Sequence, residues 1–113
     1  MRRTIYAVLA LVALALGTPA YAQQTTGNIS GRITDDQDAA VPGVTVTARQ
    51  AETGFVRTSV TDGEGIYRLT ALPVGTYDIT AELQGFSRVD SKGIVVSVGQ
   101  ILDIPVTLKV ASR

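Results

Sequence analysis

Apolar residues recur at every second position over most of the chain, and this alternation constrains the fold more than any other feature. A period of two places successive side chains on opposite faces of a β-strand. Six short runs show it clearly: Ile29–Ile33, Val44–Ala48, Tyr67–Leu69, Tyr77–Ala81, Val96–Val98 and Leu102–Leu108. The run Phe55–Thr61 is rich in β-formers and completes a set of seven strands. No stretch of ten residues has helical spacing, so the pattern predicts an all-β sandwich.

Turn-forming sequences separate these runs. In Val41–Val44, Pro42 presets φ and Gly43 supplies the positive φ that a type II turn requires. The Asp-Gly pair in Asp62–Gly65 predicts a hairpin, and Leu72–Gly75 predicts a similar bend. With these turns we expect antiparallel strands, consecutive ones pairing or lying close. The turn and core residues that we single out are Pro42, Gly43, Asp62, Gly63, Gly65, Tyr67, Leu72, Pro73, Gly75, Tyr77, Gly85 and Phe86.

The first 22 residues read as a secretory signal peptide. A basic head, Met1–Arg3, precedes an apolar run of twelve residues, Ile5–Leu16, and Ala20-Tyr21-Ala22 matches an A-x-A cleavage site. A membrane anchor is the weaker alternative, because a spanning helix needs about 20 apolar residues. We therefore expect a leader at 1–22, a linker at 23–27, the sandwich at 28–110 and a tail at 111–113.

The charge of the mature chain excludes some partners. Removal of Arg2 and Arg3 leaves eight basic and ten acidic residues, a net charge of −2 with no block of one sign. Such a balance gives no electrostatic footprint for nucleic acid or an anionic membrane, and nothing in the mature chain predicts a membrane span. With no cysteine to form disulfides, stability has to come from aliphatic packing and well-formed turns.

The turn sequences, taken together, resemble the carboxypeptidase regulatory-like domain. The resemblance extends over nearly all of residues 27–110 and implies a seven-stranded, prealbumin-like or Ig-like sandwich. It rests on Gly31, Val41-Pro42-Gly43-Val44-x-Val46, Thr53-Gly54, Thr61-Asp62-x-x-Gly65-x-Tyr67, Leu72-Pro73-x-Gly75-x-Tyr77 and Gly85-Phe86. With Val98-Gly99-Gln100 before the final strand, the chain is most similar to the N-terminal domain of Oar-like TonB-dependent outer-membrane receptors.

Two functions follow from this resemblance. In such receptors a plug domain and a barrel come after the sandwich, whereas the sequence here ends at Arg113. The first hypothesis is a non-catalytic periplasmic accessory domain, a fragment of a receptor. The second is a free-standing exported sandwich that binds a carbohydrate or a protein at the cell surface.

Catalysis is not expected. The chain has no histidine and no cysteine, which removes the usual general bases, thiol nucleophiles and zinc ligands. A related prealbumin-like hydroxyisourate hydrolase relies on histidines and a Tyr-Arg-Gly-Ser ending, while this chain ends in Val110-Ala111-Ser112-Arg113. We expect no enzyme and no cofactor.

Two ligand alternatives compete with structural explanations of the same residues. The acids of Asp35–Asp38 and Asp62-x-Glu64 could hold Ca²⁺, but short acids favour turns by bonding their own backbone, and no EF-hand loop is present. Tyr67 and Tyr77 could bind a sugar, but both fall on the inward phase of their strands. The pattern favours core rings whose hydroxyls reach the edge of the sandwich.

The strand edges suggest how a partner would bind. The first strand, Asn28–Thr34, has little to block edge pairing, whereas the last carries Asp103, Pro105 and Lys109. We expect a protein partner, or the remainder of a receptor, at an edge strand or loop rim. The outward phase of the strands holds Ser30, Arg32, Thr45, Thr47, Arg68, Thr80, Asp103 and Lys109.

Overall fold

The computed structural model describes residues 25–111. The predicted leader lies outside the described residues, and Thr26–Gly27 of the expected linker already belong to the first strand. The strands are β1 Thr26–Asp35, β2 Thr45–Gln50, β3 Val56–Val60, β4 Ile66–Pro73, β5 Gly75–Glu82, β6 Val89–Val96, β7 Ile101–Asp103 and β8 Val106–Leu108. Among the described residues, no helix is long and apolar enough to cross a membrane.

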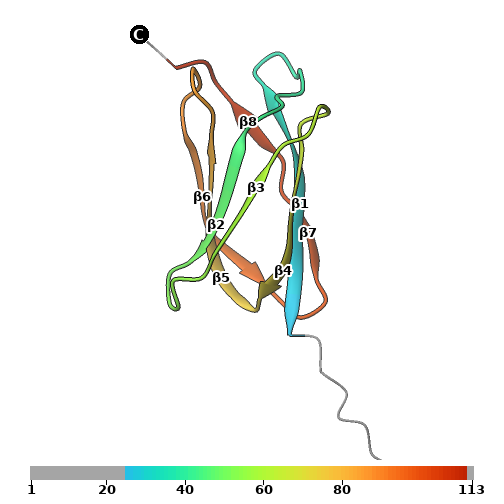
Figure 1. Ribbon diagram of the computed structural model, residues 1–113, viewed down its shortest axis with the longest axis vertical. Helices are drawn as coiled ribbons and strands as arrows, with labels where there is room; N and C mark the ends of the chain where they lie inside the picture. The colour runs from blue at the N-terminus through green and yellow to red at the C-terminus, as the bar shows by residue number, and fades with distance from the viewer. Residues whose placement is uncertain (1–24, 112–113) are drawn as a thin grey trace, which may run out of the picture.

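The strands form two facing sheets, which confirms the predicted all-β sandwich (Figure 1). One sheet has the order β4-β1-β7, with β8 also paired to β1, and the other has the order β3-β2-β5-β6. The inward phases of both sheets make one core, in which Tyr67 and Tyr77 are fully buried. Ile29, Ile33, Val44, Val46, Ala48, Leu69, Leu72, Ile79, Ala81, Val96 and Leu108 complete its interior.

The last predicted strand is present as two short strands, so eight are counted in place of seven. Both β7 and β8 pair with β1 in one continuous register, with Asn28 opposite Ile101 and Ile33 opposite Val106. Pro105 lies between them and has no N–H to donate to the ladder. The interruption is therefore local, and the overall path of the strand is as expected.

The expectation of a wholly antiparallel sandwich is wrong, because β7 and β8 run parallel to β1. The chain leaves β6 in one sheet and enters β7 in the other, which brings the final strands alongside β1 in the same direction. Consequently β1 is the central strand of its sheet, between β4 and β7. The expectation that Asn28–Thr34 forms an open edge is also wrong.

Two of the predicted turns connect the sheets and do not form hairpins. Asp62–Gly65 joins β3 to β4, and Leu72–Gly75 carries the chain from β4 to β5, so each crosses from one sheet to the other. The hairpins are β2–β3 and β5–β6. Asp-Gly specifies a tight reversal, but the sheet that the next strand joins depends on contacts remote in sequence.

The strand predicted at Val96–Val98 lies earlier in the chain, at Val89–Val96. Val96 is buried as expected, but Val98 is 59% exposed. A turn begins at Ser97, where the carbonyl accepts the amide of Gln100 at 3.1 Å and Gly99 has φ of 68°. This turn, which the alternation alone does not reveal, removes Val98 from the core.

Candidate functional site

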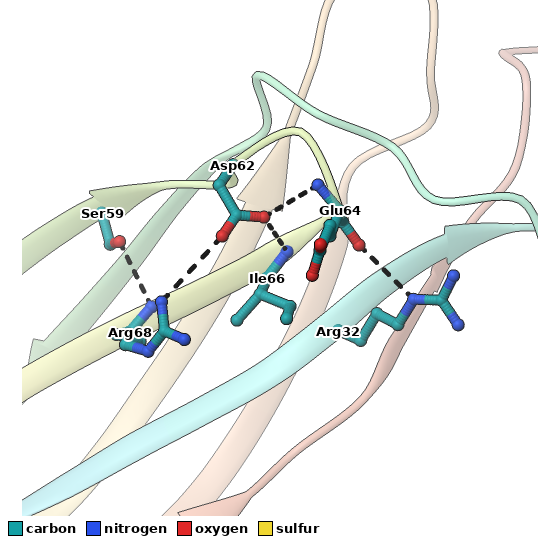
Figure 2. Close-up of polar contacts among 6 residues, drawn as sticks. All are labelled: Arg32, Ser59, Asp62, Glu64, Ile66 and Arg68. Carbon is teal, nitrogen blue, oxygen red and sulfur yellow. Dashed lines mark hydrogen bonds and ion pairs between the residues drawn. The ribbon is translucent and has the colours of Figure 1, made fainter.

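The side chain of Asp62 bonds the backbone of its own turn. One carboxylate oxygen of Asp62 accepts the amides of Glu64 and Ile66, at 2.9 and 3.0 Å, while the other lies 4.0 Å from the guanidinium of Arg68 (Figure 2). The pKa of Asp62 is lowered by the Ile66 and Glu64 amides and, to a smaller extent, by Arg68. The carboxylate is therefore used to fix the turn.

Gly65 in the same turn meets a steric requirement. Its φ is 79°, and a Cβ at this position would lie 2.5 Å from the carbonyl oxygen of Ile33. Figure 2 shows the two neighbouring links of the turn, from Arg32 on β1 to the Glu64 carbonyl and from the Arg68 amide to the Ser59 hydroxyl. Gly63 differs from Gly65, because a Cβ added there would meet no atom within 4 Å.

Asp35 begins a second acidic loop with the same local pattern. Its carboxylate accepts the amides of Gln37 and Ala39, each at 2.9 Å. Within residues 25–111, no three or more Asp, Glu, His or Cys side chains are grouped so that they could hold a metal ion. One residue of each acidic segment, Asp35 in the first and Asp62 in the second, therefore bonds backbone amides of its own loop.

The other predicted turn residues also have structural contacts. At Pro42-Gly43, where Gly43 has φ of 79°, the buried Thr61 hydroxyl donates to the Val41 carbonyl and accepts the Val44 amide. The Tyr67 hydroxyl donates to the Ile104 carbonyl at 2.6 Å, and burial, followed by the charge of Asp103, raises the pKa of Tyr67 to about 12.

Leu72–Gly75 packs against the end of β2. The Tyr77 hydroxyl donates to the Pro73 carbonyl at 2.5 Å, and burial raises the pKa of Tyr77. Leu72 is fully buried, and Gly75 faces the buried side chain of Gln50, whose amide donates to the Val74 carbonyl. These residues form a packed end of the sandwich.

Gly85 and Phe86 lie in the β5–β6 connection at the other end. Gly85 has φ of 91°, and Phe86 is half-buried against the core. The Gly85 carbonyl accepts the amide of Ala111, and the Ser87 amide donates to the Lys109 carbonyl, so the last described residues are paired to this loop. Phe86 also lines a hollow at the surface, as does Gly43 among the predicted turn and core residues.

The outward face of β2, β5 and β6 carries side chains that the turns do not use. We call it the polar face and define it by nine residues in three cross-strand rows. The rows are Arg49–Asp78–Lys92, Thr47–Thr80–Asp90 and Thr45–Glu82–Arg88. The pleat directs these side chains away from the core because Val46, Ala48 and Ile79, which alternate with them, are buried.

Two adjoining hollows follow this face. One, of about 350 Å³, is lined by the polar face itself, and the other, of about 610 Å³, reaches the end of the sandwich beside Leu83 and Phe86. Glu82 and Arg88 line both hollows, so the two adjoin across this ion pair, and we call them together the groove. The groove is open, so it suits a binding surface more than an enclosed reaction chamber.

Arg88 organises the middle of the groove. Its guanidinium bonds Asp90 at 2.9 Å and lies 3.3 Å from Glu82, while the Thr80 hydroxyl donates to Asp90 at 3.1 Å. The hydrogen bond from Arg88 is the main cause that lowers the pKa of Asp90, and the same bond raises the pKa of Arg88. These contacts bring three exposed charged side chains together.

Sequence reasoning placed Thr45, Thr47 and Thr80 on the solvent side but recognised no site there. The charged members of the face come from three separate segments, and their proximity depends on strand register. The available signal was the run of polar residues at every second position in 45–49, 78–82 and 88–92. It becomes a site only when β2 and β6 are both known to pair with β5.

One protein-family model matches most of the described chain. The model of the carboxypeptidase regulatory-like domain matches residues 28–109. The chain belongs to this family. No curated protein matches the chain.

Solved structures share the fold of this carboxypeptidase regulatory-like domain. A putative carbohydrate binding protein from Bacteroides uniformis is 25% identical, with a TM-score of 0.60, over 74% of this chain and 41% of that one. The minor pilin of Streptococcus agalactiae is 12% identical, with a TM-score of 0.63, over 80% and 47%. A mutant of catechol 1,2-dioxygenase from Acinetobacter radioresistens is 13% identical, with a TM-score of 0.63, over 79% and 53%. This chain thus spans about half of each of these proteins.

Proposed function

We propose that this domain is a non-catalytic accessory module of a larger exported protein, the N-terminal periplasmic domain of a TonB-dependent outer-membrane receptor. The polar face is its contact surface. The observation that carries this proposal is the difference between two groups of polar side chains. Asp35, Asp62 and Tyr77 bond the backbone of their own fold, whereas the nine residues of the polar face, of which only Asp78 accepts a backbone amide among the described residues, line an open groove.

Several features support the receptor context. The family match covers the sandwich, and the turn sequence Val98-Gly99-Gln100 resembles that of Oar-like receptor domains. The signal-peptide pattern at residues 1–22 agrees with export. Proteins of similar fold include a pilin, and the chain accounts for about half of such proteins, as a module would.

Cell fractionation tests the receptor context. An antibody raised against residues 25–111 should detect, in the producing bacterium, a protein far larger than 113 residues that sediments with the outer membrane. Detergent should be needed to release it. A small antigen released with the periplasmic contents would contradict the proposal.

A second candidate function is a free-standing exported domain that binds a carbohydrate. The likeness to the putative carbohydrate binding protein, together with the groove that runs from Phe86 to Arg49, favours this candidate. The small periplasmic or secreted antigen that would contradict the receptor context is the result expected here. The same fractionation therefore separates the two.

A further inference from the structure

We infer that the polar face is a binding site for a neutral polysaccharide chain, which lies along β5 from Phe86 towards Arg49. This inference rests on the proposed function as a binding module. It specifies the ligand class, and it applies to the receptor module and to the free-standing domain alike.

Charge balance is the first argument. The face carries three basic side chains, Arg49, Arg88 and Lys92, and each row that contains one of them also contains an acid. Asp78, opposite Arg49, and Glu82, beside Arg88, place negative charge among the cations. A strongly anionic ligand would meet an acid in each of the three rows, and a strongly cationic ligand would meet a base in two of them. A neutral ligand meets no like charge.

Hydrogen-bonding capacity is the second argument. Sugar hydroxyls both donate and accept hydrogen bonds, so they suit a surface on which donors and acceptors alternate. Arg49 and Lys92 make no ion pair within 4.0 Å among the described residues, and both line the same hollow as Asp78, whose carboxylate accepts the Gly93 amide at 3.3 Å. Thr47 lies next to Arg49 on the same face of β2 and opposite Thr80, whose hydroxyl donates to Asp90.

The shape of the groove is the third argument. From Asp78 to Glu82, β5 rises by about 13 Å, and the groove then continues beside Leu83 and Phe86. A half-buried ring at one end offers an apolar platform for the C–H face of a sugar, while the strands offer polar contacts. An open, elongated groove of this kind accommodates a chain that continues past both ends.

The site can be tested by NMR titration of the ¹⁵N-labelled chain. The probes are maltohexaose, cellohexaose, xylohexaose and mannohexaose, with hexagalacturonate and chitosan hexamer as charged comparisons. We expect at least one neutral oligosaccharide to cause saturable shifts at the amides of Thr47, Thr80 and Asp90. Charged oligosaccharides should bind more weakly.

Matched variants locate the binding. Thr80→Val and Thr47→Val remove a hydroxyl from the polar face, and each should weaken the binding of the neutral oligosaccharide about five- to tenfold. Thr70→Val makes the same change on the exposed face of β4 in the other sheet, and it should leave binding unchanged. An unfolding curve of each variant checks that the fold is retained.

Three results would overturn the inference. They are no saturable shifts with any neutral probe at millimolar concentration, preferential binding of a charged probe, or equal binding by Thr47→Val, Thr80→Val and the wild type. None of them touches the receptor context, which depends on the size and location of the native protein. Failure of the ligand class and failure of the proposed function are therefore distinguishable.

Discussion

Tyr77 is fully buried between the two sheets, with its ring edge-on to Phe55 and its hydroxyl bonded to the Pro73 carbonyl. Tyr77→Ala should lower the free energy of unfolding by about 3–5 kcal/mol, because a large core ring is lost. Tyr77→Phe keeps the ring and should cost about 1 kcal/mol through the lost hydrogen bond. Urea denaturation measures both. A loss below about 0.5 kcal/mol for Tyr77→Ala would place the ring at the surface.

Gly75 leaves room for a buried polar side chain. A Cβ at this position would overlap Nε2 of Gln50, which is bonded to the Val74 carbonyl, and the φ of Gly75 is 155°. Gly75→Val should therefore destabilise the domain by about 1–3 kcal/mol. Gly63→Val is the matched control, since Gly63 has open space around it. Equal midpoints in urea for the two variants would refute this explanation.

At the scale of elements, the Asp62 turn should be sensitive to acid. The pKa of Asp62 in the folded protein lies below its ordinary value of 3.8 because the carboxylate accepts the Ile66 and Glu64 amides. A carboxyl whose pKa is lower in the folded protein than in the unfolded chain stabilises the fold at pH values above its pKa in the unfolded chain. This stabilisation is lost as the pH falls through the pKa in the folded protein. The melting temperature of Asp62→Asn should therefore lie below that of the wild type at neutral pH and converge with it in acid.

Glu52→Gln is the control for this titration. Glu52 is exposed in the β2–β3 hairpin and makes no hydrogen bond or ion pair among the described residues. Its variant should follow the wild-type melting temperature at every pH. A difference in melting temperature between Asp62→Asn and the wild type that stays constant down to strong acid would show that the charge of Asp62 does not stabilise the turn.

The central position of β1 makes a prediction for amide exchange. Amides of β1 lie between β4 and β7, whereas β3 pairs only with β2. In the β2–β3 ladder, the Gln50 amide donates to the Phe55 carbonyl at one end and the Thr61 amide donates to the Val44 carbonyl at the other. Hydrogen-bonded and non-hydrogen-bonded residue pairs alternate between these ends, so the amide of Thr58 points away from β2. The Ser30 amide should exchange much more slowly than that of Thr58. Comparable rates would contradict the observed strand order.

Most of the fold could be predicted because strand alternation and turn chemistry are local. Tyr67 and Tyr77 were placed in the core from their spacing, and Gly43 was assigned its positive φ from the Pro-Gly pair. The parallel pairing of β7 with β1 could not be predicted, because it joins residues about seventy positions apart. The polar face could not be predicted for the same reason, because only the strand register brings Arg49, Asp78 and Lys92 to one face.

At the scale of the whole molecule, the arrangement of the ends bears on how the domain is used. The described chain begins with β1 at one end of the sandwich and finishes beside the β5–β6 connection at the other (Figure 1). The groove opens at this second end, next to Phe86. A neighbouring domain attached there would lie close to a ligand on the polar face, which links the proposed module role to the inferred binding site.

Cysteine labelling in native envelopes tests whether the polar face is the contact surface of the domain. The chain has no cysteine, so Thr80→Cys and Thr70→Cys each introduce a single reactive thiol, one on each sheet. Maleimide should label both variants readily in the purified chain. In the envelope we predict that labelling falls for Thr80→Cys and stays unchanged for Thr70→Cys. Undiminished labelling of Thr80→Cys, or protection of Thr70→Cys alone, would contradict the account.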